Sequence, residues 1–82
     1  MIFVGDDMDY DYIDRLTALR QDRDIGQKVI AGILGCKQST VSKYELRRSR
    51  YEIDDLIKLC KFYHVSADYI LGLPKGMEYP ER

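Results

Sequence analysis

The polar residues best suited to recognising a ligand lie together in residues 27–46, QKVIAGILGCKQSTVSKYEL. In this stretch an apolar segment is followed by a run of amide, hydroxyl and ammonium side chains. A helix that buries an apolar face and leaves such groups on its open face can read base edges in a DNA major groove. The sequence therefore predicts sequence-specific binding of double-stranded DNA. The predicted base-contacting residues are Gln38, Ser39, Thr40, Ser42 and Lys43.

Individual side chains of this run suit particular base edges. The amide of Gln38 can make a bidentate contact to adenine, and Lys43 can donate to the acceptors of guanine. Ser39 and Thr40 are adaptable partners, and the methyl group of Thr40 can meet the methyl group of thymine. The alternative for all of them is an ordinary solvated helix face.

The apolar residues of the same stretch predict how such a helix is held. Ala31 fits a close helix crossing, because a larger side chain would push the second helix away. Gly35 fits the turn, because a positive φ costs glycine nothing. We expect helices over residues 27–34 and 38–46, which together form a helix-turn-helix unit. The remaining residues of the expected apolar seam are Ile30, Leu34, Cys36, Val41 and Tyr44.

Three further helices are predicted from apolar spacing. The first covers residues 10–22, the fourth residues 53–63, and a short fifth begins after Ser66 and stops at Gly72. The expected fold is therefore all-α with about five helices. The periodic residues are Tyr12, Ile13, Leu16 and Leu19 in the first helix and Ile53, Leu56, Ile57 and Cys60 in the fourth.

The length of 82 residues suits one small domain. We expect an acidic arm over residues 1–9, the domain over residues 10–73 and a tail over residues 74–82. No apolar run approaches the roughly 18 residues that span a membrane, and the apolar start MIFV is too short for a signal-peptide core. A cytoplasmic location is expected, with Cys36 and Cys60 as reduced, buried residues.

The distribution of charge supports a nucleic-acid partner, although the net charge is −1. Residues 1–14 carry five acids and no base, whereas residues 15–50 carry nine bases against three acids. The basic block coincides with the predicted helix pair, as a local electrostatic footprint requires.

Over residues 13–73 the chain resembles the phage-repressor-like, or XRE, family of helix-turn-helix regulators. The resemblance includes the helix pair, residues 53–63, and the segment VSADYILG at residues 65–72. It implies a compact five-helix, lambda-repressor-like DNA-binding domain with the helix-turn-helix at its second and third helices. The function so implied is that of a transcriptional regulator, and we expect a repressor.

The resemblance also implies roles for single residues. Gln27 matches a glutamine that contacts a backbone phosphate and braces the third helix, and Gln38 matches one that contacts a base edge. Arg20 and Glu45 match a pair that forms an ion pair between the first and third helices. The other positions that match groove-facing residues are Ser39, Ser42 and Lys43.

The loop after the third helix offers cations to the phosphate backbone. Two positions there depart from the family pattern, since Arg47 replaces a common glycine and Tyr51 a common proline. Gly26 and Lys37 stand where a Ser or Thr cap is usual, so both motif helices are expected to lack a capping side-chain oxygen. The alternative for the cations is solvated surface charge. The predicted phosphate-contacting residues are Gln27, Lys28, Lys37, Arg47, Arg48, Arg50 and Tyr51.

One domain of this size covers only a few base pairs, so we expect a homodimer. A symmetric dimer would place its two recognition helices about 34 Å apart, on successive major grooves. The residues that could form the dimer contact are Ile70, Leu71, Leu73 and Met77.

Enzymatic activity is not expected. The one histidine, His64, has no evident nucleophile or carboxylate partner, and the sequence has no phosphate-binding glycine loop or metal-ligand spacing. No cofactor or metal is therefore predicted, and the acidic start lacks the pattern of a calcium loop.

The alternative is a protein-binding module of the same fold, such as an antitoxin, an anti-repressor or a regulatory subunit. A protein partner would be recognised by exposed apolar residues on the third helix. On the second helix, Val29 and Ile33 are ambiguous, since one of them can be exposed.

Overall fold

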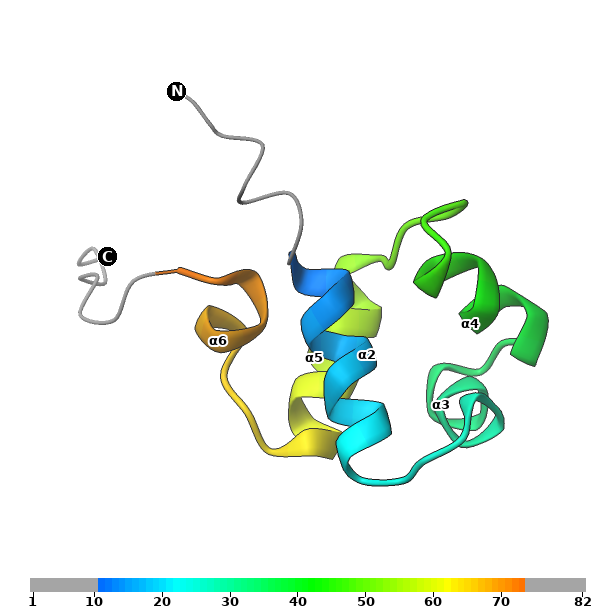
Figure 1. Ribbon diagram of the computed structural model, residues 1–82, viewed down its shortest axis with the longest axis horizontal. Helices are drawn as coiled ribbons and strands as arrows, with labels where there is room; N and C mark the ends of the chain where they lie inside the picture. Colours follow the sequence, from blue (N-terminus) through cyan, green and yellow to red (C-terminus); the bar gives the residue numbers. More distant parts are fainter. Residues whose placement is uncertain (1–10, 74–82) are drawn as a thin grey trace.

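The computed structural model describes residues 11–73, which form five helices and no strand (Figure 1). The predicted all-α fold is therefore confirmed. The predicted acidic arm and tail lie outside the described residues. The helices are α2 (Tyr12–Asp22), α3 (Gln27–Leu34), α4 (Gln38–Glu45), α5 (Ile53–Tyr63) and α6 (Ala67–Leu71).

The bounds of the helices follow from residues at their ends. The carboxylate of Asp11 accepts hydrogen bonds from the backbone N–H groups of Ile13 and Asp14, and Asp14 accepts from the N–H of Asp11. This capping box begins α2 at Tyr12. The hydroxyl of Ser66 accepts from the N–H of Tyr69 at 3.1 Å and caps α6. The caps of α3 and α4, Gly26 and Lys37, make no such bond, as predicted.

Left-handed residues end three of the helices. Gly35 ends α3 with φ 73°, and Gly72 ends α6 with φ 72°. His64 ends α5 with φ 63°, although it carries a side chain. A residue with positive φ turns the chain away from the helix axis and lets the final carbonyls find partners.

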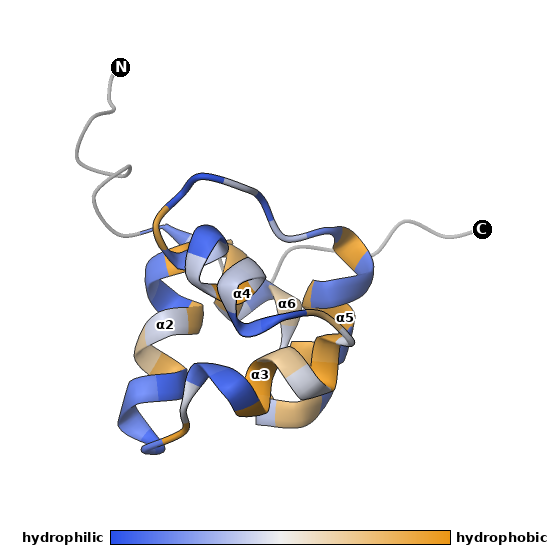
Figure 2. Cartoon of the chain, turned by 90° about the vertical axis from the view of Figure 1, so that its right-hand side faces the viewer, coloured by the Kyte–Doolittle hydropathy of each residue, from blue (hydrophilic) through white to orange (hydrophobic). Residues whose placement is uncertain are grey.

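The hydrophobic core is built from every helix. Figure 1 shows α3 and α4 on one side of α2 and α5, with α6 on the opposite side. Figure 2 shows most of the hydrophobic colouring on α3 and α5, whereas α4 and the loop after it are mainly hydrophilic. The buried residues are Ile13, Leu16, Ile30, Ala31, Leu34, Val41, Tyr51, Leu59, Tyr63 and Ile70.

The buried face of α5 differs from the predicted one. Ile53 and Ile57 are 71% and 47% exposed, whereas Leu59 and Tyr63 are buried and Leu56 packs on the core. The residues in contact with the core are Leu56, Leu59, Cys60 and Tyr63. They repeat the predicted spacing three residues later in the sequence, so spacing alone does not distinguish the two faces.

Three other features of the described residues bear on function. No helix within residues 11–73 is both long and apolar enough to cross a membrane. The same residues hold no cluster of three or more potential metal ligands. Cys36 and Cys60 are free and partly buried, and burial raises the pKa of both thiols. A raised pKa keeps a thiol protonated and weakly reactive.

Candidate nucleic-acid interface

The turn between α3 and α4 has the predicted geometry. Gly35 has φ 73° and ψ 35°, and its N–H and that of Cys36 both donate to the carbonyl of Ala31. An added Cβ at Gly35 would meet no atom within 4 Å, so the positive φ, and not lack of space, favours glycine there. Ala31 is 5% exposed, which is consistent with a close helix crossing. The three-residue connection thus sets α4 against α3.

α4 has one buried face and one open face. Val41 is fully buried, and the ring of Tyr44 lies 4.5 Å from the ring of Tyr51, measured between centroids. On the open face Gln38, Ser39 and Lys43 are exposed. The remaining predicted base-contacting residues, Thr40 and Ser42, are partly buried. All five residues therefore belong to the helix named in the prediction, and three of them are freely accessible.

Glu45 joins three helices at the end of α4. Its carboxylate accepts hydrogen bonds from Arg20 Nε at 2.7 Å, from Arg20 Nη2 at 2.9 Å and from Gln27 Nε2 at 2.8 Å. Arg20 also donates through Nη1 to the carbonyl of Ile25 at 3.0 Å. The side chains of Arg20 and Glu45 are only 15% and 11% exposed. The ion pair that the resemblance implied is thus present and fixes α4 relative to α2 and α3.

Arg20 keeps its positive charge at any ordinary pH. The hydrogen bond to Glu45 raises the pKa of Arg20 above its usual value, although burial opposes the shift. Arginine is already protonated in proteins, so Arg20 remains a charged donor in this contact.

Gln27 lies between this contact and the open face of α4. Its Nε2 atom donates to Glu45, and its Oε1 atom lies 3.5 Å from Nε2 of Gln38. The first distance describes a firm hydrogen bond, whereas the second is at the limit for one. Gln27 is therefore held in place, while the exposed Gln38 can turn towards a ligand.

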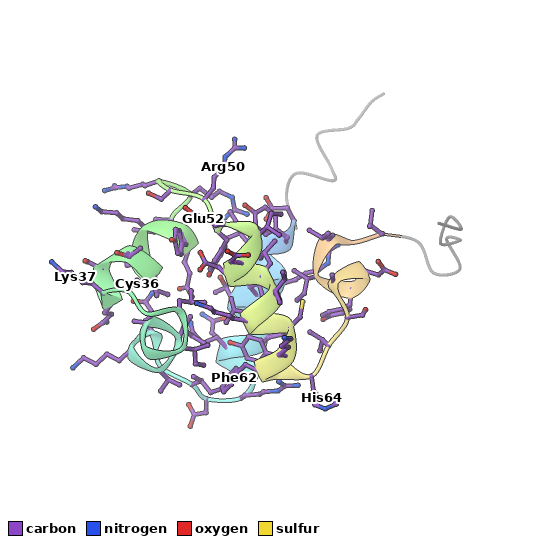
Figure 3. All side chains as sticks on the ribbon, turned by 180° about the vertical axis from the view of Figure 1, so that it is seen from behind. Cys36, Lys37, Arg50, Glu52, Phe62 and His64 are labelled. Atoms are coloured by element: carbon purple, nitrogen blue, oxygen red, sulfur yellow. The ribbon has the colours of Figure 1, made fainter. Side chains whose placement is uncertain are left out.

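The loop after α4 contains one arginine in an ion pair and two that form none with the described residues 11–73. Arg47 Nη2 lies 2.8 Å from Asp11 Oδ1 and 3.1 Å from Asp14 Oδ1. The hydrogen bond to Asp14 raises the pKa of Arg47. Arg48 and Arg50 are exposed and form no ion pair within residues 11–73. Figure 3 shows Arg50 pointing away from the body of the molecule.

Tyr51 lies in the core, which the sequence analysis did not expect. It is 8% exposed, and its ring lies against those of Tyr44 and Tyr12. Burial raises its pKa well above the usual value. The residue anchors the end of the loop by packing, so it is not a surface group available to phosphate. Because Tyr51 follows four polar residues, Arg47 to Arg50, its sequence position suggested an exposed loop residue.

Five cations near the helix pair are exposed and unpaired among the residues that the structure describes. Lys28 lies in the first turn of α3, and Lys37 is the residue directly before α4. Figure 3 shows Lys37 pointing outward. An uncompensated group of cations attracts a polyanion, whereas paired cations such as Arg20 contribute little to such a field. The five residues are Lys28, Lys37, Lys43, Arg48 and Arg50.

The contact of Arg47 with Asp11 and Asp14 was not predicted from the sequence. The two sides of the contact are 36 residues apart for Arg47 and Asp11, so no local spacing reveals it. Its only signal is compositional, since acids at a helix start and a basic loop can attract one another.

The fold and the geometry of α3 and α4 define a helix-turn-helix protein. Residues 14–70 match the family described as a helix-turn-helix domain. This match covers more than half of the chain, and the chain therefore belongs to the helix-turn-helix family.

Two known proteins are similar to this chain. An uncharacterized HTH-type transcriptional regulator, YobD of Bacillus subtilis (strain 168), is 36% identical over 62 residues, which are 76% of this chain and 55% of YobD. The crystal structure of a transcriptional regulator from Listeria innocua has the same fold, with a TM-score of 0.72 at 23% identity. That match covers 84% of this chain and 64% of the Listeria chain. The present chain thus spans less than two thirds of the length of either protein.

Proposed function

We propose that the chain is a sequence-specific, double-stranded DNA-binding transcriptional regulator, and specifically a repressor of the phage-repressor-like class. In this proposal α4 enters the major groove. The observation that carries it is the open face of α4, whose exposed Gln38, Ser39 and Lys43 stand on a helix fixed by Val41 and Glu45. Membership of the helix-turn-helix family and the similarity to two proteins named as transcriptional regulators support the same function.

The dimensions of α4 suit this role. An α-helix with its side chains is about 10–12 Å in diameter, and the major groove of B-DNA is about 12 Å wide, so α4 can lie in the groove. Gln38 in the first turn contacts an adenine edge, and Lys43 donates to guanine acceptors. The hydroxyl groups of Ser39 and Ser42 adapt to either neighbour, and the methyl group of Thr40 faces a thymine where its partial exposure allows.

Contacts to phosphate orient the helix in this proposal but do not read sequence. The amide of Gln27 lies at the first residue of α3, where a helix N-terminus also favours an anion. The exposed cations that flank α4 supply the charge. The proposed phosphate-contacting residues are Gln27, Lys28, Lys37, Arg48 and Arg50. Of the other two predicted residues, Arg47 is paired with Asp11 and Asp14, and Tyr51 is buried.

One domain of this size covers only a few base pairs, so we retain the homodimer, with two copies on one operator, as part of the proposal. Of the residues predicted for the dimer contact, Leu71 and Leu73 are 45% and 43% exposed. Ile70 is 1% exposed and belongs to the core, so it is not available for a dimer contact. Met77 lies outside the described residues.

The alternative of a protein-binding module has two apolar residues in its favour. Val29 on α3 is 49% exposed, as the sequence analysis foresaw for one residue of this helix, and Leu46 after α4 is 61% exposed. The open face of α4, however, carries amide, hydroxyl and ammonium groups, which suit base edges better than a protein surface.

Selection of binding sites from random duplex DNA tests the proposed function. The wild-type chain should enrich one short sequence at a stated salt concentration, and Gln38→Ala should enrich a shorter or more degenerate one. Asp68→Asn is the control, because Asp68 is exposed on α6, which lies on the side of the molecule opposite α4 (Figure 1). Failure of the wild-type chain to enrich any sequence would contradict the proposal.

A further inference from the structure

Arg47 links the exit of α4 to the start of α2 through two carboxylates. One nitrogen, Nη2, lies 2.8 Å from Asp11 Oδ1 and 3.1 Å from Asp14 Oδ1. Asp11 caps α2 and Asp14 lies in its first turn, so both acids are fixed by the helix they begin. The guanidinium of Arg47 therefore contacts two carboxylates whose positions are set by the capping box of α2.

The backbone conformation of Arg47 is unusual for a residue that carries a side chain. Arg47 has φ 64°, a left-handed conformation that residues with a Cβ adopt at a cost. Its N–H donates to the carbonyl of Tyr44 at 3.1 Å, which closes the turn after α4. The loop thus leaves α4 in a direction that brings the arginine to the acids of α2.

The contact changes the charge that the loop offers to DNA. Arg47 alone would add one positive charge beside Arg48 and Arg50. Together with Asp11 and Asp14 it forms a group of three charged side chains with a formal net charge of −1. Arg50 lines the same pocket as Asp11 and Arg47, so this negative charge lies next to a proposed phosphate contact.

We propose that Asp11 and Asp14 compete with DNA phosphate for Arg47 and so lower the affinity of the chain for DNA. Carboxylate and phosphate oxygens accept the same charge-assisted hydrogen bonds from a guanidinium. While the acids hold Arg47, phosphate contact at this loop depends on Arg48 and Arg50. The inference rests on the proposed function, and it assigns to the start of α2 an inhibitory role in that function.

The test neutralises the two acids without removing their caps. Asparagine is about as good as aspartate at a helix N-cap, so D11N/D14N should keep α2 intact, as circular dichroism can verify. Affinity for the selected duplex is then measured over a series of salt concentrations. We expect D11N/D14N to bind at least about threefold more tightly at 0.1 M salt, with a salt slope steeper by about 0.9, the value for one added phosphate contact.

A second background separates competition for Arg47 from general repulsion of DNA by the acids. In R47Q the same two substitutions should change neither the affinity nor the slope beyond the effect of D68N. Asp68 is an exposed acid of α6, on the far side of the molecule from α4 (Figure 1).

The possible outcomes distinguish competition for Arg47 from other effects of the two acids. An equal gain with and without Arg47 would show general repulsion, and a loss of affinity in D11N/D14N would show that the acids assist binding; either result overturns the inference. If the wild-type chain selects a duplex and the acid substitutions have no effect, only this inference fails. If neither the wild-type chain nor D11N/D14N selects any duplex, the proposed function fails as well.

Discussion

Arg20 at the end of α2 holds Glu45 at the end of α4 by two parallel hydrogen bonds, with Nε 2.7 Å from Oε2 and Nη2 2.9 Å from Oε1. Bidentate contacts of this kind fix direction as well as distance. Because Gln27 donates to the same carboxylate, α4 is oriented by both of the helices that precede it. The orientation of the proposed recognition helix thus depends on a contact that is made entirely within the protein.

Loss of this contact should reduce stability and DNA affinity together. Glu45→Ala leaves the largely buried Arg20 without its acceptor, and we expect a loss of about 2 kcal/mol in the free energy of unfolding. Urea denaturation of Glu45→Ala, Arg20→Ala and the double variant measures the coupling between the two side chains, expected at about 1–3 kcal/mol. Strict additivity of the two single substitutions would show that the contact has no energetic role.

Arg48 should contribute to affinity without contributing to specificity. It is exposed and forms no ion pair among residues 11–73, so Arg48→Ala removes a phosphate contact from all duplexes alike. We expect a uniform loss of affinity and a salt slope shallower by about 0.9. Lys61→Ala, at an exposed cation on α5, is the control. A slope that Arg48→Ala leaves unaltered would remove the loop from the proposed interface.

Alkaline pH should destabilise the fold through Tyr51 and Tyr63. Burial raises the pKa of both phenols in the folded chain, so the unfolded chain releases their protons first. The stabilisation from keeping them neutral is present below the unfolded pKa of about 10 and declines as the pH rises above it. Urea denaturation between about pH 9 and pH 11 measures this decline.

The matched variants for the alkaline decline are Tyr51→Phe and Tyr69→Phe. The first removes a buried phenol and should weaken the pH dependence, whereas the second changes a half-exposed tyrosine and should not. Tyr51→Phe should also leave DNA affinity at neutral pH unchanged, because the ring lies in the core. A clear loss of affinity in Tyr51→Phe would restore the phosphate contact that the sequence suggested.

The helix pair was predictable from sequence because its constraints are local. Ala31, Gly35 and Val41 meet steric demands set by a close crossing and a short turn, which hold wherever the rest of the chain lies. The Arg20–Glu45 contact came from family resemblance, since 25 residues separate its partners and no spacing rule connects them.

The features that sequence did not reveal depend on packing between distant segments. Two stripes of α5 have the same spacing, and only contact with the other helices selects the one that includes Leu59 and Tyr63. Tyr51 is buried although it follows four polar residues, because two tyrosines from other elements receive its ring. The Arg47 contact requires a left-handed residue and a helix start brought together by the fold.

The most direct test of the proposed function is a cycle that combines Gln38→Ala with a change of the base pair it faces in the selected duplex. If Gln38 reads that base edge, each single change should cost about 1–3 kcal/mol of binding free energy, and the two together little more than either alone. Costs that simply add, or a Gln38→Ala variant that binds and discriminates like the wild-type chain, would contradict reading of DNA by α4.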